Sequence, residues 1–458
     1  MKSRTRLPKA TALESAAFFL AVFLPTTAKG PIIRRPKVEA GAERLGLDDR
    51  AVRRMAKLAR KYPKGPLMLR LPGRKQAVVL RPEHLHYVLA NSPEPFSPAS
   101  SEKKAALAHF EPRFVLISEG RERTARRALQ EQVLDAHCPV HHLAASFIPI
   151  VREEADQLLR GIKDGSPAGN MELGWDRFVQ SWDRVVRRSI FGDQARDDHE
   201  LTDMLAKLRE NANWSFLKPK DKGLRTKFLS RVEDRMKDAE PGSLAFSMAK
   251  MHPGQDAAPV DQIPQWLFAL ETTGMATFRT LALLATHPEH LAAAKAEVEQ
   301  DTTERRHVPF LRACVLDSLR LWPTTPVILR QSTRELEWPD GDMPARCGVL
   351  IYVPYFHRDE ARVPQAHSFT PERWLDKNGD EGWPLVPFSD GPVFCPGRQL
   401  ALMLSSAMLG SLIEKSSFAL SSPQALGPEK RLPGALNNFS LRFTVSGSQP
   451  HPSREPSA

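Results

Sequence analysis

One stretch of the chain, residues 264–286, restricts the fold more than any other. It begins with a proline, ends before His287-Pro288, and carries apolar residues on nearly every face of a helix built over it. At about 1.5 Å per residue, such a helix is about 35 Å long, enough to cross a domain. Because a helix that is apolar all round must be buried, the sequence predicts a domain built around one long central helix.

The middle of that helix is polar, since Glu271 is followed by Thr272 and Thr273. A carboxylate inside a buried helix is costly unless a polar group meets it. A threonine hydroxyl can also bond to the carbonyl one turn back and distort the helix. The residues by themselves leave two interpretations open: a water-bridged polar spot in a core helix, or part of a functional site.

The remaining hydrophobic pattern is mainly helical, and the 458-residue chain has the composition of a globular protein, with 41% hydrophobic and 26% charged residues. Helices are predicted over 44–62, 82–89, 119–134, 143–215 and onward to about 300, and 309–321; a hairpin over 67–80; strands over 349–353 and 439–445; and a loop over 93–115. The predicted fold class is mostly α with small β-sheets (α+β). We expect a leading segment at 1–39, one domain at 40–445 and a disordered tail at 446–458.

The amino-terminal residues fit two interpretations. Basic residues precede an apolar run at 16–24, as in a signal peptide, but the run is shorter than the roughly 20 residues that span a bilayer. Glu14 in front of the run instead favours a leading helix that packs on the domain and ends at Pro25. Four cysteines without a CxxC pair suit the reducing cytoplasm. We therefore expect a cytoplasmic protein with no stable membrane span, and export is the alternative.

Charge and metal motifs argue against several other classes of function. The net charge is +11, but the basic residues are dispersed, so we expect no nucleic acid partner; an acidic protein or an anionic cofactor suits this charge. No HExxH, phosphate-binding loop or Gly-rich dinucleotide motif is present. His137, Cys138, His141 and His142 supply four potential zinc ligands within six residues, but this spacing is too tight for a tetrahedral site.

Residues 388–397, called the Cys395 loop below, place one cysteine directly before a long apolar helix. Helix N-termini stabilise a thiolate, which acts as a nucleophile or a metal ligand. A single thiolate does not support a tetrahedral zinc or iron–sulfur site, whereas it suits haem iron. On helix 309–321, Asp317 and Arg320 are three residues apart, and spacing alone predicts an ordinary exposed pair there.

Together these segments resemble the cytochrome P-450 family, the haem-thiolate monooxygenases. The pattern of the family's haem loop, Phe-x-x-Gly-x-x-x-Cys-x-Gly, is met by Phe388, Gly391, Cys395 and Gly397. The family's Pro-Glu-Arg-Trp and His-Arg-Asp elements appear at 371–374 and 357–359. The resemblance covers residues 40–445 and is to the bacterial soluble type.

The resemblance implies a triangular, mostly helical domain that binds haem b and activates O2 to oxidise a small apolar organic substrate. Electrons would come from a separate ferredoxin or other redox partner, because the chain has no dinucleotide-binding motif. The alternatives are a peroxide-using or rearranging haem-thiolate enzyme, and a haem-binding protein without turnover.

The resemblance also gives residues their roles. Cys395 would be the axial ligand of the haem iron, in a loop shaped by Phe388, Gly391 and Gly397. Glu271 and Thr272 would form the acid–alcohol pair that delivers protons in catalysis. Arg330, and either Arg126 or Arg127, would bind the haem propionates.

This chain departs from the family pattern at three places. The structural charged triad of the family would be Asp317, Arg320 and Arg373, with Asp317 where the family has Glu. Val393 stands where the family usually has a basic residue for a propionate. Phe268-Ala269 replaces the usual small residue and Gly before the acid–alcohol pair.

Overall fold

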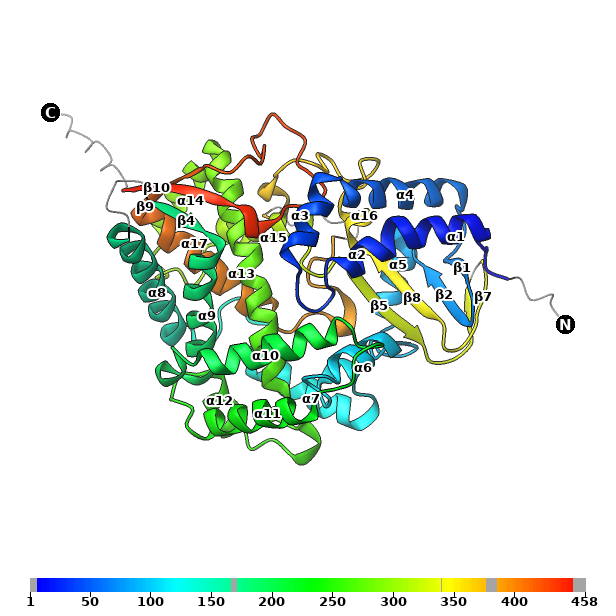
Figure 1. Ribbon diagram of the computed structural model, residues 1–458, viewed down its shortest axis with the longest axis horizontal. Helices are drawn as coiled ribbons and strands as arrows, with labels where there is room; N and C mark the ends of the chain where they lie inside the picture. The colour runs from blue at the N-terminus through cyan, green and yellow to red at the C-terminus, as the bar shows by residue number, and fades with distance from the viewer. Residues whose placement is uncertain (1–5, 166–170, 339, 376–384, 448–458) are drawn as a thin grey trace.

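The computed structural model describes residues 6–165, 171–338, 340–375 and 385–447. Figure 1 shows a helical body around the long α13 (Ile263–Thr286), beside a smaller region that holds the largest sheet. The other helices of this body are α7 (Gly120–Val133), α8 (Ala144–Asp164), α9 (Trp175–Phe191), α10 (His199–Ala212), α11 (Lys222–Lys237), α12 (Leu244–Lys250), α14 (Pro288–Gln300), α15 (Pro309–Leu321) and α17 (Arg398–Lys415). The predicted fold class, mostly α with small sheets, is confirmed.

Among the described residues, the largest sheet has five strands in the order β1-β2-β8-β5-β3. Only β2 and β8 pair in parallel; the neighbours on either side are antiparallel. The strands of the three sheets are β1 (Leu67–Leu71), β2 (Arg74–Val78), β8 (Gly348–Tyr352), β5 (Val327–Ser332) and β3 (Phe96–Ser97); β4 (Glu172–Gly174), β10 (Arg442–Gly447) and β9 (Ser416–Leu420); and β6 (Leu336–Trp338) with β7 (Gly341–Met343).

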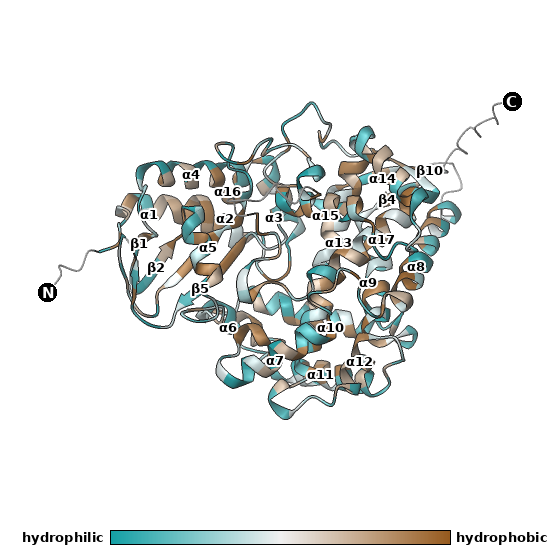
Figure 2. Cartoon of the chain, turned by 180° about the vertical axis from the view of Figure 1, so that it is seen from behind, coloured by the Kyte–Doolittle hydropathy of each residue, from teal (hydrophilic) through white to brown (hydrophobic). Residues whose placement is uncertain are grey.

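The remaining helices are α1 (Ala12–Phe18), α2 (Leu24–Ala28), α3 (Pro36–Arg44), α4 (Leu47–Lys61), α5 (Pro82–Ala90), α6 (Ser101–Leu107) and α16 (Val353–His357). One buried cluster joins the sheet to α1, α4 and α5, and a second fills the helical body. Figure 2 shows hydrophobic residues along β5, whereas the outer side of α4 is largely hydrophilic.

Two helices and one hairpin lie where the sequence predicts them. The helix predicted over 264–286 is α13, and the one predicted over 309–321 is α15. The hairpin predicted over 67–80 is β1 and β2, which meet at Pro72-Gly73. In each case proline or glycine marks the boundary within the local sequence.

The prediction of a loop over 93–115 is wrong. This region contains β3 and α6, and the Ser100 side chain accepts a hydrogen bond from the Lys103 N–H at the start of α6. Its prolines lie outside α6, so they bound the helix instead of preventing it. Strands β4, β5, β6, β7 and β9 were not predicted either, because most are too short to show a period of two.

The amino-terminal helix packs on the domain, as predicted, but it does not end at Pro25. A π-helical turn over Phe19–Phe23 follows α1, so Pro25 falls in the first turn of α2, where its missing N–H costs little. Phe18 and Val22 are buried against the sheet region. None of the helices in the described ranges is both long and apolar enough to cross a bilayer. From residue 448 onward the predicted tail lies outside the described residues, and its first two residues end β10.

Candidate functional site

The Cys395 loop leads into α17 and connects the helical body to the sheet region (Figure 1). Two backbone hydrogen bonds close it: Cys395 N–H donates to the Phe388 carbonyl at 2.9 Å, and Phe394 N–H donates to the Gly391 carbonyl at 3.0 Å. The Phe388 ring packs against the main core. The loop therefore holds the thiol of Cys395, which is half-buried, in a fixed backbone frame.

Gly391 is required by its conformation and by its neighbours. Its φ is +66°, in the left-handed region, and a Cβ there would lie 2.3 Å from the Leu89 carbonyl oxygen of α5. Gly397 is different, since its φ is negative and a Cβ would meet only the Cys395 sulfur at 4.0 Å. Gly397 instead gives its backbone N–H to the thiol.

The surroundings of Cys395 shift the pKa of its thiol in opposite directions. Burial raises the pKa of the thiol, whereas the Gly397 N–H and the Arg127 and Arg398 guanidinium groups lower it. These groups stabilise a negative charge on sulfur at the start of α17, where the helix dipole acts in the same sense.

The two arginines that the sequence left open on α7 have different surroundings. Arg127 donates from Nη1 to the Phe394 carbonyl at 2.8 Å, and its guanidinium carbon lies 4.7 Å from the centre of the Phe394 ring. Its Nη2 is buried and has no partner. Arg126 instead contacts Ser118, the Asp256 carbonyl and Glu122. The structure thus brings Arg127 to the Cys395 loop, whereas Arg126 has its partners elsewhere.

Arg330 reaches the same loop from β5. Its Nη2 lies 3.4 Å from the Ser389 hydroxyl and its Nε lies 3.0 Å from the Ser92 hydroxyl. The side chain is buried, and within the described residues no carboxylate forms an ion pair with it. Burial, together with the nearby Arg123, lowers the pKa of Arg330 to about 10.

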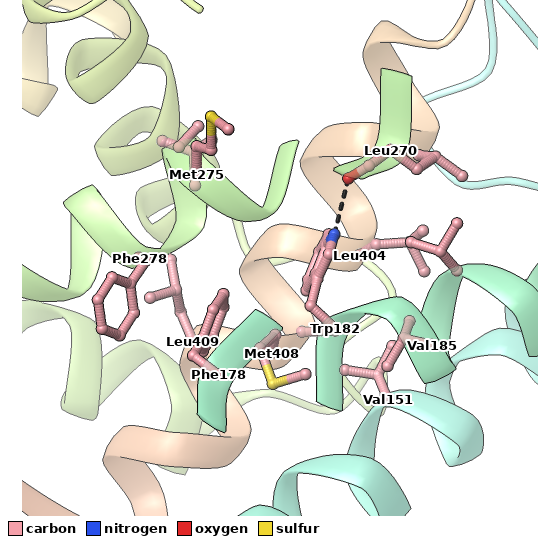
Figure 3. Close-up of a cluster of buried hydrophobic side chains, with 14 of the residues drawn as sticks. Val151, Phe178, Trp182, Val185, Leu270, Met275, Phe278, Leu404, Met408 and Leu409 are labelled. Atoms are coloured by element: carbon pink, nitrogen blue, oxygen red, sulfur yellow. Dashed lines mark hydrogen bonds between the residues drawn. The ribbon is translucent and has the colours of Figure 1, made fainter. Parts of the chain in front are cut away.

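The middle of α13 has a face that is only partly buried. Gln265, Phe268, Ala269 and Thr272 are half-buried, and their spacing places them on one side of the helix. The opposite side packs on α9, where a Cβ on Gly274 would lie 2.6 Å from the Trp182 ring. The Trp182 indole N–H donates to the Leu270 carbonyl at 2.7 Å (Figure 3). This close contact fixes how α13 presents Thr272.

Both threonines of α13 donate to one carbonyl. The distances from the Thr272 and Thr273 hydroxyls to the Ala269 oxygen are 2.8 and 3.1 Å. A hydroxyl bonded in this way still has lone pairs that accept a hydrogen bond from water or a ligand. The structure therefore keeps Thr272 in a defined position on the half-buried face.

Glu271 forms an ion pair with Arg209 of α10, a residue that the sequence analysis did not single out. Arg209 also lies over the Phe268 ring, at 4.4 Å, and donates to the Ile32 carbonyl. Asp183 on α9 is close enough for Glu271 to affect it: burial and the Glu271 charge raise the pKa of Asp183 to about 7. No sequence motif marks Arg209 or Asp183, because both are distant from α13 along the chain.

Asp317 and Arg320 are fully buried, so the exposed pair that spacing alone predicts is wrong. Asp317 accepts two bonds from Arg320, at 2.6 and 3.0 Å, and others from the Thr370 N–H at 2.8 Å and the Trp374 indole at 3.1 Å. Arg373 lies 3.5 Å away. Burial tends to raise the pKa of Asp317, but Arg320 and these donors hold it below its usual value.

The structure also tests the cluster of potential zinc ligands. Asp135, His141 and His142 offer ligand atoms within 4.8 Å of one another. Both nitrogens of His141 are already used, by the Leu143 N–H and the Val133 carbonyl, and Asp135 accepts bonds from His142. These contacts fix the turn after α7, and we assign no metal site to them.

Comparison with known proteins matches residues 261–440 to the family model described as Cytochrome P450. This range contains the middle of α13, α15 with its triad, and the Cys395 loop. The matched part of the chain is similar to the cytochrome P450 family.

Curated relatives of this chain come from plants and animals. It is 27% identical over 308 residues to Cytochrome P450 93G1 of Oryza sativa subsp. japonica, which covers 62% of this chain and 56% of the relative. It is 29% identical to Geraniol 8-hydroxylase of Swertia mussotii, over 33% of each chain, and 29% identical to Ferruginol synthase 1 of Rosmarinus officinalis, over 35% of each. The chain thus matches between about a third and just over half of the length of these relatives.

Proteins of the P450 family bind haem, and the residues of this site suit that cofactor. Cys395 offers one half-buried thiol in an anchored loop. Arg330 is buried without a carboxylate partner among the described residues, and Arg127 keeps one buried nitrogen unpaired. Buried cations are costly without a counter-charge, and the haem propionates are anions that supply one.

Proposed function

We propose that this chain is a monooxygenase that holds haem b through Cys395 and uses O2 to oxidise a small apolar organic substrate. The observation that supports it most is the Cys395 loop, in which one thiol is fixed beside Arg127, whose buried Nη2 has no partner. The name of one relative, Geraniol 8-hydroxylase, agrees with oxidation of an organic compound. Bound haem would supply the reductive activation of dioxygen.

The chain's own residues would position this cofactor and control protons. Arg127 and Arg330 would hold the propionates by charge-assisted hydrogen bonds. Thr272 would accept a hydrogen bond from a water in the pocket, and its O–H would turn from the Ala269 carbonyl to donate on the reacting side. Glu271 would exchange protons with that water after leaving Arg209, whose contact now keeps the carboxylate on the α10 side.

Asp317, Arg320 and Arg373 would act structurally in this proposal. They tie α15 to residues 370–374, and His357 ties the same region to the chain before the Cys395 loop, because its Nε2 accepts from the Val386 N–H at 2.8 Å. Electrons would come from a separate ferredoxin or other redox protein, as in soluble bacterial members of the family. Cytoplasmic residence is proposed on the four unpaired cysteines.

The ferrous carbon monoxide spectrum tests the ligand assignment. The wild-type protein should give the band of a thiolate-ligated haem. Cys395→His should retain some haem but move the band to the position typical of imidazole ligation. Cys138→Ser, at an exposed cysteine, is the control that should leave the band unchanged. A thiolate-type band in Cys395→His would show that another cysteine is the ligand.

Thr272→Ala tests the proton role and separates the monooxygenase from a peroxide-using or rearranging enzyme. Haem content and the carbon monoxide band should stay normal, since the helix and the Trp182 contact remain. With reductase and ferredoxin, more electrons should end as hydrogen peroxide and fewer as product, because acid–base groups contribute about 10²- to 10⁴-fold. Thr273→Ala is the neighbouring control. An unchanged yield of product per electron would contradict the role of Thr272 and favour the peroxide-driven alternative.

A further inference from the structure

Two more cations lie near Arg330 and Arg127, and neither the sequence motifs nor the relatives assign them a role. Lys103 on α6 donates from Nζ to the Leu329 carbonyl at 3.2 Å, directly before Arg330. Arg123 on α7 lies one turn before Arg127 and donates to the Val115 carbonyl at 2.7 Å. Lys103 and Arg123 therefore extend the group that contains Arg127 and Arg330.

Among the described residues, no carboxylate forms an ion pair with Lys103, Arg123 or Arg330. The nearest acidic neighbour of Lys103 along the chain, Glu102, is paired with Arg74. Arg127, by contrast, has Glu131. Three cations without counter-charges inside a protein are unfavourable unless an anion joins them.

The pKa values agree with this geometry. Burial lowers the pKa of the Lys103 ammonium well below its usual range, and Arg330 and Arg123 lower it further. Burial and Arg127 lower the pKa of Arg123 to about 10. Lys103 is thus destabilised by Arg330 and Arg123, and Arg123 by Arg127, which agrees with their positions on neighbouring segments.

The Cys395 loop lacks the basic residue that the family places two positions before the cysteine. In this chain that position is Val393, whose side chain is buried and apolar. It can make no polar contact with an anion. A cofactor with two carboxylates must then find its second partner on another element.

We propose that Lys103 and Arg123, together with Arg330, bind the two haem propionates and replace the contact that Val393 cannot make. This inference rests on the proposed haem binding. It assigns α6 and the first half of α7 to the cofactor site, and it explains why unpaired cations are kept inside the protein. Lys103 has a long flexible chain, so its ammonium can move from the Leu329 carbonyl to a carboxylate.

Haem release to an excess of apomyoglobin tests this proposal without measuring activity. Lys103→Met should lose haem about 10- to 100-fold faster than wild type, the factor expected for a hydrogen bond between charged groups. Lys103→Arg should release it near the wild-type rate. Lys104→Met is the matched control, because Lys104 is the next residue of α6 but is exposed and paired with Glu119. Arg123→Gln should behave as Lys103→Met does.

Haem dimethyl ester, which lacks both propionate charges, distinguishes contact from a merely structural role. Wild type and Lys103→Met should lose the ester at the same rate. Faster loss of both haem and ester from Lys103→Met would mean that Lys103 supports the fold, and an unchanged rate of haem loss would mean that it does not reach the cofactor. Either result overturns the inference. If the wild-type protein takes up no haem at all, the proposed function itself fails.

Discussion

Two acid–arginine pairs in this protein are built very differently. Asp317 and Arg320 share helix α15, three residues apart, and both side chains are fully buried. Glu271 of α13 pairs with Arg209 of α10, 62 residues away, and the Glu271 side chain is 26% exposed. The first pair is local and enclosed, whereas the second joins two helices across a half-open space.

The difference extends to the groups around each pair. The Arg320 guanidinium also donates to the carbonyls of Ala366 and Ser368, so the first pair has its hydrogen-bonding capacity nearly filled. In the second pair, the Arg209 Nε is buried without a partner, and a second acid, Asp183, shares the region. A filled pair holds one geometry, whereas a pair with a spare acid and a spare donor can rearrange. The first arrangement suits support of the Cys395 loop, and the second suits proton movement.

The largest effect on stability is expected for Asp317→Ala. It leaves Arg320 buried without its counter-charge, which costs about 3–5 kcal/mol in the free energy of unfolding. The control is Asp234→Ala, since Asp234 pairs with Lys237 at the same spacing but on an exposed surface; it should change stability by less than about 0.5 kcal/mol. Urea denaturation measures the free energy of unfolding of each variant. If both variants lose the same amount, the buried pair contributes no more to stability than the exposed pair does.

An intermediate effect is expected for Asp183→Asn, and it should depend on pH. Burial and the Glu271 charge raise the pKa of Asp183 to about 7 in the folded protein, whereas its ordinary value, 3.8, applies to the unfolded chain. The folded state therefore binds the extra proton between these values, and wild-type stability falls as pH rises from about 4 to 7. Asp183→Asn removes this loss, so its stability relative to wild type should grow by about 2–3 kcal/mol between pH 5 and pH 7.5. Parallel stability curves for the two proteins would contradict the raised pKa.

The smallest effect on stability is expected for Glu271→Gln. The pair is partly exposed, so its loss should cost less than about 1 kcal/mol. Removal of this negative charge should also lower the pKa of Asp183, which shifts the fall in stability to lower pH. In turnover, oxygen consumption should slow, with less hydrogen peroxide formed than in Thr272→Ala. A loss as large as that of Asp317→Ala would show that the second pair is structural too.

Much of the candidate site could be predicted from the sequence because its signals are local. Gly391 and Cys395 lie in one loop, and helix α17 begins three residues after the cysteine. The position of α13 followed from its mainly apolar composition and from the prolines at its boundaries. These features depend on backbone conformation and spacing within a few residues, which the local sequence determines.

The tertiary structure decided what depends on contacts between distant segments. The sequence could not choose between Arg126 and Arg127, because one residue along a helix changes the side-chain direction by about 100° and only the packing of α7 on the Cys395 loop fixes it. It gave no sign that Asp317 and Arg320 are enclosed, because burial is supplied by residues 366–374 from another part of the chain. Arg209 and Lys103 have ordinary surroundings in the sequence. Their roles arise only when folding places charges from separate helices in one space of low dielectric constant, where an unpaired charge is costly.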